Sequence, residues 1–124
     1  MAAPNVVNVS TITGITTFLN LTTTNATVLL SNATSSGKVF KVNSIIVANV
    51  DGVAAADITV KLHNAAAGAG TSFALASTVS VIQDSSLVVL DKTSSIYLEE
   101  NKSITVIASA SNDLDVVCSY EEIS

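Results

Sequence analysis

The 124-residue sequence contains no arginine, no tryptophan and a single cysteine, and only 12% of its residues are charged. Positive charge is limited to five lysines, and the net charge is −5. Because nucleic-acid binding needs a basic stripe or patch, this composition argues against a DNA or RNA partner. The lone Cys118 cannot form an internal disulfide, so we expect a fold that does not depend on an oxidising compartment.

Long apolar runs are also missing. No stretch approaches the ~18 consecutive apolar residues that a membrane-spanning helix needs. The opening MAAPNVVNVSTITG lacks the basic start and the continuous apolar core of a secretory signal. We therefore expect no membrane partner and no export by a classical signal.

The residues that are abundant favour strands. Apolar residues make up 48% of the chain but aromatic residues only 4%, and about a quarter of the chain is serine or threonine. β-Branched side chains suit the pleated surface of a sheet and lose rotamer freedom in a helix. The composition therefore predicts an all-β protein, and its length predicts one domain that buries roughly two thirds of its unfolded surface.

Alternation with a period of two recurs along the chain. In FKVNSIIVANV it places one apolar set on a single face, which we expect to be the core face: Phe40, Val42, Ile46, Ala48 and Val50. The pair Asp51-Gly52 then predicts a tight hairpin turn into DITVKLHN. There Ile58, Val60 and Leu62 form the core face, opposite the solvated face of Thr59, Lys61 and His63.

Further short apolar segments follow at regular spacing, in SFALASTVSVI, SLVVLDK and SIYLEE. Together they predict an antiparallel β-sandwich of the jelly-roll kind, although a closed barrel stays possible. We place the sandwich domain at residues 23–124. Residues 1–22 are expected to form either an extended N-terminal arm or a first strand, and residues 28–30 an edge strand.

The chain ends on two alternating segments around an Asn-Asp corner. Residues 103–110 and 114–120 predict a terminal hairpin, which is stable only if it pairs inside a sheet. Its second strand places one apolar set on the core face: Leu114, Val116, Cys118 and Tyr120. Cys118 is thus expected to be a small buried hydrophobic residue and not a reactive thiol.

Residues capable of catalysis or metal binding are sparse. His63 is the only histidine, and with no second ligand nearby we expect it to be solvated. Asp113 and Asp115 lack the ligand spacing of a calcium loop, and the glycines at 68 and 70 lack the lysine of a phosphate loop. We therefore predict no enzyme activity, no cofactor and no metal.

Two segments are apolar on both faces, namely SIIVANV and LVVL. Antiparallel strands with one solvated face alternate, so a strand that is apolar on both sides must be covered on both. A second copy of the chain is the expected cover, in a trimer or closed ring with an interface of about 1,000 Å² or more. The candidate subunit interface consists of Ile45, Val47, Val88 and Leu90.

Three segments carry a resemblance to a known group of proteins. VNSIIVANVDG, SIYLEENKSITVIASA and the terminal SYEEIS resemble small virion structural proteins of tailed phages, especially phages of cyanobacteria, over residues from about 11 to 124. Members often carry glycine where this chain has Asn101. The resemblance implies an all-β decoration or neck and tail accessory protein, located on virions assembled in the host cytoplasm.

The resulting hypothesis is a non-enzymatic virion subunit that binds copies of itself and other virion proteins, such as the major capsid protein or neck and tail proteins. The alternative is a carbohydrate-binding module of a tail or fibre that recognises host surface glycans. Glycan binding needs an exposed aromatic ring beside polar side chains. Tyr97, expected to point away from Ile96 and Leu98, is the candidate ring.

Overall fold

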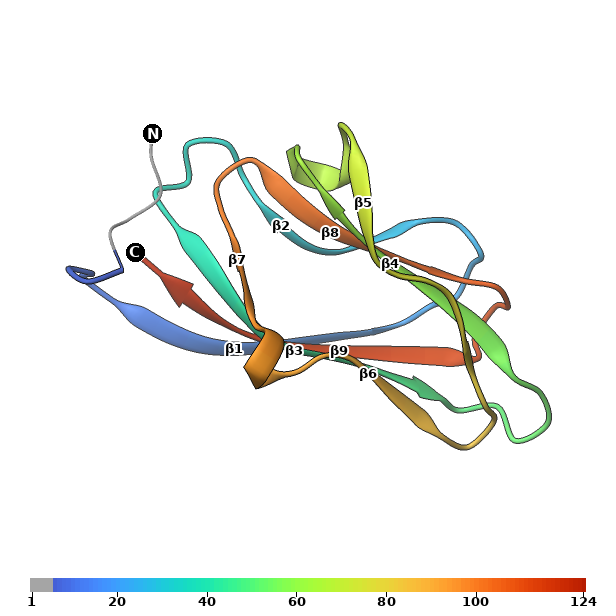
Figure 1. The fold of residues 1–124 in the computed structure, drawn as a ribbon. Helices are drawn as coiled ribbons and strands as arrows, with labels where there is room; N and C mark the ends of the chain where they lie inside the picture. Colours follow the sequence, from blue (N-terminus) through green and yellow to red (C-terminus); the bar gives the residue numbers. More distant parts are fainter. Residues whose placement is uncertain (1–5) are drawn as a thin grey trace.

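The alternating segments form nine strands in the computed structural model, which describes residues 6–124. These strands make two antiparallel sheets that face each other as a sandwich (Figure 1). Sheet A contains β1 (Ile12–Asn20), β9 (Leu114–Ile123), β3 (Val39–Asn49) and β6 (Ser86–Leu90) in that order, and β7 (Ile96–Leu98) also pairs with β3. Sheet B contains β2 (Thr27–Asn32), β8 (Lys102–Ala108), β4 (Ala56–His63) and β5 (Ser72–Val81) in that order.

Two single-turn 3₁₀ helices, η1 (Ala66–Gly68) and η2 (Lys92–Ser94), lie in the connections. The turn at Asn101, between β7 and β8, has a φ of 57°, in the left-handed region that favours glycine.

The core lies between the inner faces of the two sheets. Ile45 and Leu114 from sheet A and Ile58 and Ile104 from sheet B have no exposed surface. Burying each such side chain contributes about 1.5–3 kcal/mol relative to leaving it in water. The sandwich is thus held by apolar contact between sheets, with hydrogen-bonded ladders within each sheet.

The closing strand β9 is central in sheet A, hydrogen-bonded to β1 on one side and β3 on the other. Its predicted core face is confirmed, because all four residues of that set are buried: Leu114, Val116, Cys118 and Tyr120. The predicted terminal hairpin is wrong. β8 belongs to sheet B, so residues 109–113 cross from one sheet to the other.

The predicted tight hairpin at Asp51-Gly52 is also wrong, because β3 and β4 lie in different sheets. Asn49, at the end of β3, is buried and donates hydrogen bonds to the carbonyls of Ala54 and Val81. The Asp51 carboxylate in turn accepts from the backbone N–H groups of residues 53 and 54. These bonds shape residues 50–55 into a sheet-crossing loop.

A β-bulge in β3 reverses the predicted faces of its second half. Val42 pairs with Tyr120 and Ser44 with Ser119, so Asn43 is an extra residue without its own partner on β9. Alternation therefore shifts by one position, and Ile45 points into the core while Ile46 points outward. The prediction that Ile46 faces the core is wrong for this reason.

The segment before residue 23 includes a regular strand. β1 pairs with β9 over its whole length without a register shift, and Thr11 and Ser124 extend the ladder by exchanging both backbone hydrogen bonds. Of the two possibilities for the N-terminal segment, residues 12–20 form a first strand. Residues 1–5 of the predicted arm lie outside the described residues.

The bulge makes two adjacent isoleucines a matched pair for mutagenesis. Ile45→Ala removes a side chain with no exposed surface and is expected to lower the free energy of unfolding by about 2–5 kcal/mol. Ile46→Ala is expected to cost less than about 1 kcal/mol, because Ile46 lies on the outer face. Urea unfolding of both variants checks this, and a larger loss in Ile46→Ala would contradict the observed register.

Candidate interaction surface

Four apolar side chains form a row across the outer face of sheet A. Phe18 of β1 is opposite Val117 of β9, Val117 is opposite Ile46 of β3, and Ile46 is opposite Val88 of β6. Their exposed fractions are 75%, 39%, 37% and 55%, respectively. We call these four residues the outer row. It runs at right angles to the strands and is covered by no other described element.

Mostly polar residues flank the outer row on both sides. One neighbouring set of cross-strand partners contains Thr16, Ser119 and Ser44, and the other contains Asn20, Asp115, Ala48 and Ser86. An apolar centre with a polar border is the usual anatomy of a protein interface.

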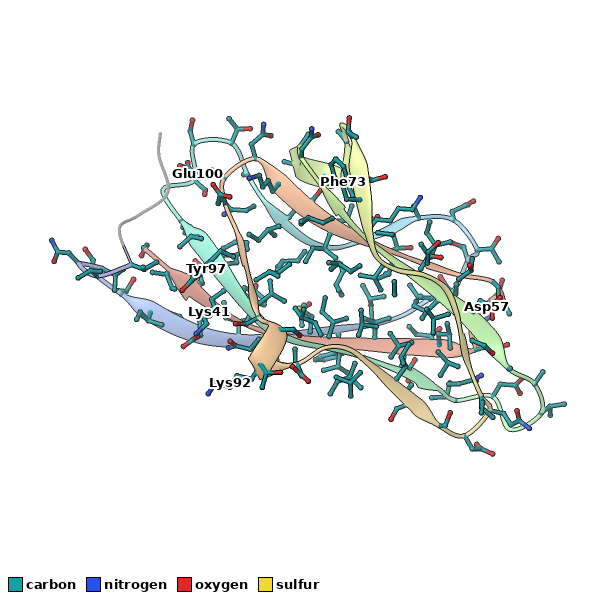
Figure 2. The ribbon with its side chains drawn as sticks, viewed as in Figure 1. Lys41, Asp57, Phe73, Lys92, Tyr97 and Glu100 are labelled. Atoms are coloured by element: carbon teal, nitrogen blue, oxygen red, sulfur yellow. The ribbon has the colours of Figure 1, made fainter. Side chains whose placement is uncertain are left out.

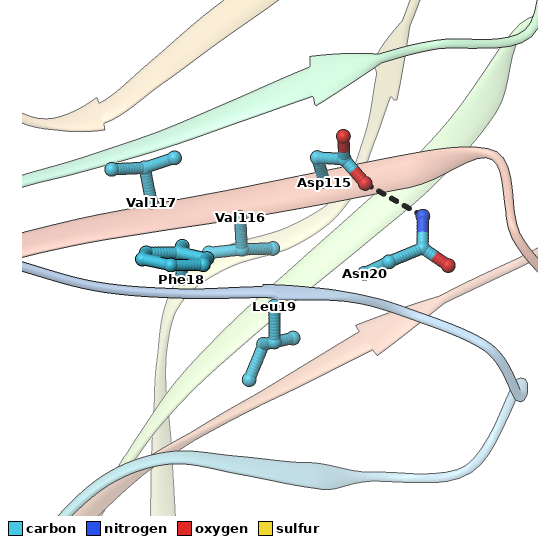
Figure 3. Close-up of a pocket in the computed structure, with 6 residues that line it drawn as sticks. All are labelled: Phe18, Leu19, Asn20, Asp115, Val116 and Val117. Carbon is cyan, nitrogen blue, oxygen red and sulfur yellow. Dashed lines mark hydrogen bonds between the residues drawn. The ribbon is translucent and has the colours of Figure 1, made fainter.

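A shallow hollow of about 330 Å³ lies at the β1 end of the outer row (Figure 3). The amide of Asn20 donates a 2.6 Å hydrogen bond to the Asp115 carboxylate at its rim. The lining residues come from β1 and β9 alone: Phe18, Leu19, Asn20, Asp115, Val116 and Val117. With its one carboxylate already hydrogen-bonded and otherwise mostly apolar walls, this hollow suits an apolar contact.

Among residues 6–124, charged residues are absent from every strand at a sheet edge. β1, β2, β5, β6 and β7 contain none. The charged residues within strands all lie on the four inner strands β3, β4, β8 and β9: Lys41, Asp57, Lys61, Lys102, Asp115, Glu121 and Glu122. Natural sheets usually protect their edges with charges that discourage pairing with other chains, so these edges lack a common protection.

The structure corrects the interface predicted from the sequence. Ile45 and Val47 have no exposed surface and Leu90 is 5% exposed, so these three belong to the core. Their inward direction follows from the bulge at Asn43, since Leu90 pairs with Ile45. Of the predicted set, only Val88 lies on the surface, where it forms one end of the outer row.

Sequence reasoning missed the other three members of the outer row. Phe18 and Val117 each alternate with an inward apolar neighbour, so the sequence shows that both faces are apolar there. That pattern could have identified them together with Ile46. It could not have shown that they align, because the alignment depends on which strands pair.

A second pocket, of about 280 Å³, opens between the sheets beside β7. Tyr97 points outward as predicted and is 50% exposed, and Phe73 of β5 is 63% exposed (Figure 2). Lys102 and Glu99 form a 2.8 Å ion pair at the same pocket. The other lining residues are Leu62, His63 and Asn64. Two exposed rings beside polar side chains are typical of sites that bind small polar ligands.

His63 is buried and not solvated, which corrects the prediction from the sequence. Its Nε2 lies 2.8 Å from the Thr105 hydroxyl and its Nδ1 lies 3.2 Å from the carbonyl oxygen of Ala69. Nδ1 thus links β4 to the residue that follows η1, and Nε2 links β4 to β8 within sheet B. The ring has a structural role, and no nitrogen is left for a ligand.

Burial governs the chemistry of Cys118. The thiol is fully buried between the sheets, and desolvation raises its pKa to about 12. At Asp91, hydrogen bonds led by that from the Thr93 hydroxyl lower the pKa of the carboxyl.

Among residues 6–124, no group of three His, Cys, Asp or Glu side chains is placed to hold a metal ion. No helix in the same range is long and apolar enough to cross a membrane.

Comparison with known proteins shows that the fold is similar to that of a solved structure. No protein-family model and no curated protein matches the chain. The structure is similar to a solved chain from Bacillus endospore appendages, which form a family of disulfide-linked pili. The TM-score is 0.54 at 15% sequence identity, over 92% of this chain and 88% of the other. The predicted antiparallel β-sandwich is confirmed.

The buried thiol predicts a specific response to alkaline pH. Above the ordinary thiol pKa of about 8.5 the unfolded chain loses the Cys118 proton, whereas the folded chain retains it up to about pH 12. The free energy of unfolding should therefore fall with rising pH in this window, by about 1.4 kcal/mol per pH unit from this group. Urea unfolding between about pH 8 and pH 11 should show a shallower fall for Cys118→Ala. Equal slopes would contradict thiol burial.

Proposed function

We propose that this protein is a non-enzymatic structural subunit that associates with copies of itself through the outer face of sheet A. The observation that carries the proposal is the outer row, which places four exposed apolar side chains in register across four strands. Uncovered apolar rows with polar borders mark interaction sites on soluble proteins. Burial of apolar surface contributes about 25 cal/mol per Å², so covering the row favours association.

The low charge of the chain supports the same conclusion. With 12% charged residues, none of them on edge strands, no charged side chain of an edge strand has to be desolvated when copies come into contact there. A stable interface buries about 1,200–2,000 Å² in total. The outer row with its serine, threonine and asparagine border would supply the apolar centre and polar rim of such an interface.

The fold likeness to a pilus subunit supports a structural role, because that protein forms appendages. The mode of linkage differs in this chain. Its one cysteine, Cys118, lies fully buried between the sheets with its pKa raised to about 12. A folded copy therefore presents no thiol for a bond to its neighbour, and the proposed assembly is non-covalent.

The particle that we propose for this subunit is the virion of a tailed phage, where it would decorate or cement the head or serve as a neck or tail accessory protein. The resemblance of VNSIIVANVDG, SIYLEENKSITVIASA and SYEEIS to such proteins supports this assignment. The partners would be further copies, in a trimer or ring, and neighbouring virion proteins. Immunogold labelling of purified phage particles would test it, and particles without label would contradict it.

A charge in the centre of the outer row is expected to prevent association. Val117→Lys places an ammonium group between Phe18 and Ile46, where a second copy would have to desolvate it. Sedimentation velocity should show wild-type complexes larger than the 12.6 kDa chain and a shift of Val117→Lys towards that mass. Circular dichroism should show that the β fold is retained.

Ser80→Lys is the matched control, since it adds the same charge at an exposed position of β5 in sheet B. It should leave the sedimentation of the wild type unchanged. A wild-type protein that stays a single copy at every concentration would contradict the proposal, and so would complexes that Val117→Lys leaves intact.

A second candidate function is glycan binding, favoured by the pocket beside Tyr97. A sugar ring can stack on the exposed faces of Tyr97 and Phe73 while its hydroxyls bond to Glu99, Lys102 and Asn64. This arrangement supplies the aromatic and polar groups that the sequence only began to indicate.

Binding to a glycan array would test this second function. Tyr97→Ala should abolish any signal from the wild type, whereas Phe18→Ala, which removes an exposed ring far from the pocket, should keep it. Absence of binding by the wild type, or equal loss in both variants, would exclude the pocket as a glycan site.

A further inference from the structure

The free edge of β1 has a defined hydrogen-bonding phase. Thr11 and Ser124 exchange both backbone hydrogen bonds, and the register continues unbroken from there to Asn20. In an antiparallel ladder, residue pairs that exchange both backbone hydrogen bonds alternate with pairs that exchange none. Odd-numbered residues of β1 therefore bond to β9. Even-numbered residues direct their N–H and C=O groups to the other side, where no described strand pairs: Ile12, Gly14, Thr16, Phe18 and Asn20.

β1 is the one edge strand, among those described, that is long and regular. β2 and β5 contain register shifts against their partners, which disturb an edge. β6 and β7 are five and three residues long. β1 has nine residues, no shift, no proline and no charge. Short length, bulges, proline and charge are the usual protections against edge-to-edge pairing, and β1 has none of them.

Gly14 has no role that the packing of one copy explains. A Cβ added there would meet no atom within 4 Å. The φ of Gly14 is not in the left-handed region, so the backbone does not require a glycine at this position. Glycine inside a strand is destabilising relative to alanine. Glycine in a strand often marks the close approach of another group, and within the described chain no group approaches.

We propose that two copies pair through β1 as antiparallel neighbours, with the two-fold axis at Thr16. This proposal rests on the self-association proposed above and adds a second contact, at the edge of β1, to the contact through the outer face. In such a pair, the even-numbered residues of one copy hydrogen-bond to the even-numbered residues of the other. If residues 12–20 of the two copies also overlap completely, only one register is possible. In it Thr16 is opposite Thr16 of the second copy, Gly14 is opposite Phe18, and Ile12 is opposite Asn20.

The side chains fit this register. Even-numbered residues of β1 share the outer face, so the Phe18 ring, 75% exposed in one copy, lies over Gly14 of the other, where no side chain occupies the space. Aromatic side chains opposite strand glycines are a known way to stabilise such positions. The pairing also forms about ten backbone hydrogen bonds, and it joins the two copies of sheet A into one continuous sheet.

The absence of charge on β1 matters at the axis. A charged residue at position 16 would be directly opposite the same charge on the second copy, which is destabilising. The same geometry provides the experiment. T16K and T16E should each associate about tenfold to a hundredfold more weakly than the wild type, as sedimentation velocity measures it. An equimolar mixture should recover complexes of wild-type size.

Gly14→Val supplies an independent variant in which stability and association change in opposite directions. Valine favours strands and its Cβ would meet no atom within 4 Å in one copy, so the melting temperature of the single copy should not fall. Its side chain occupies the place of the second copy's Phe18, so association should weaken. Gly14→Val that associates like the wild type would overturn the register.

The other outcomes separate this inference from the proposed function. If Val117→Lys dissociates the complexes but T16K and T16E do not, self-association stands and pairing through β1 is overturned. If T16K and T16E weaken association and their mixture restores nothing, the two-fold axis at Thr16 is overturned. A wild type that is a single copy at all concentrations overturns both proposals.

Discussion

The extra residue in β3 decides which side chains the protein buries and which it presents. Before Asn43, alternation places Val42 in the core; after it, Ile45 and Val47 point inward and Ile46 outward. Ile46 then aligns with Val117 and Val88, so the outer row exists because of this bulge. An unbulged β3 would place Ile46 in the core and Ile45 and Val47 on the surface. The core of sheet A and its outer face are thus two results of one local irregularity.

Much of the fold is readable from alternation, because a half-buried strand must place apolar residues on one side. The strands around SLVVL and IYL and the inward face of β9 follow from the sequence in this way. Pairing does not follow, since short range patterns give no information about which sheet a strand joins. Asn49 illustrates the difficulty: a polar residue at this position suggests an outward face, yet its amide is satisfied by two carbonyls inside the protein. The predicted interface failed at Ile45 and Val47 because the bulge at Asn43, which shifts the alternation by one position, is not visible in the sequence pattern.

The distribution of charge connects the fold to the proposed role. Placing every strand charge on the inner strands leaves the sheet edges without electrostatic protection, and the outer row adds an apolar stripe that ends at the β1 edge in Phe18. Charged residues on the edge strands would be the arrangement that keeps a single copy from pairing with others. The buried thiol of Cys118 is not accessible for a disulfide between folded copies. Backbone pairing and apolar contact are the interactions that we propose for association, and β1 combines both.

Amide hydrogen exchange along β1, resolved by residue, tests this account most directly. In a single copy, Ile15 and Thr17 are bonded to β9, whereas the N–H groups of Gly14, Thr16 and Phe18 point to the free edge. The account predicts that in the wild-type protein at high concentration the amides of Gly14, Thr16 and Phe18 exchange as slowly as those of Ile15 and Thr17. Alternation of fast and slow exchange along β1 under the same conditions would contradict it.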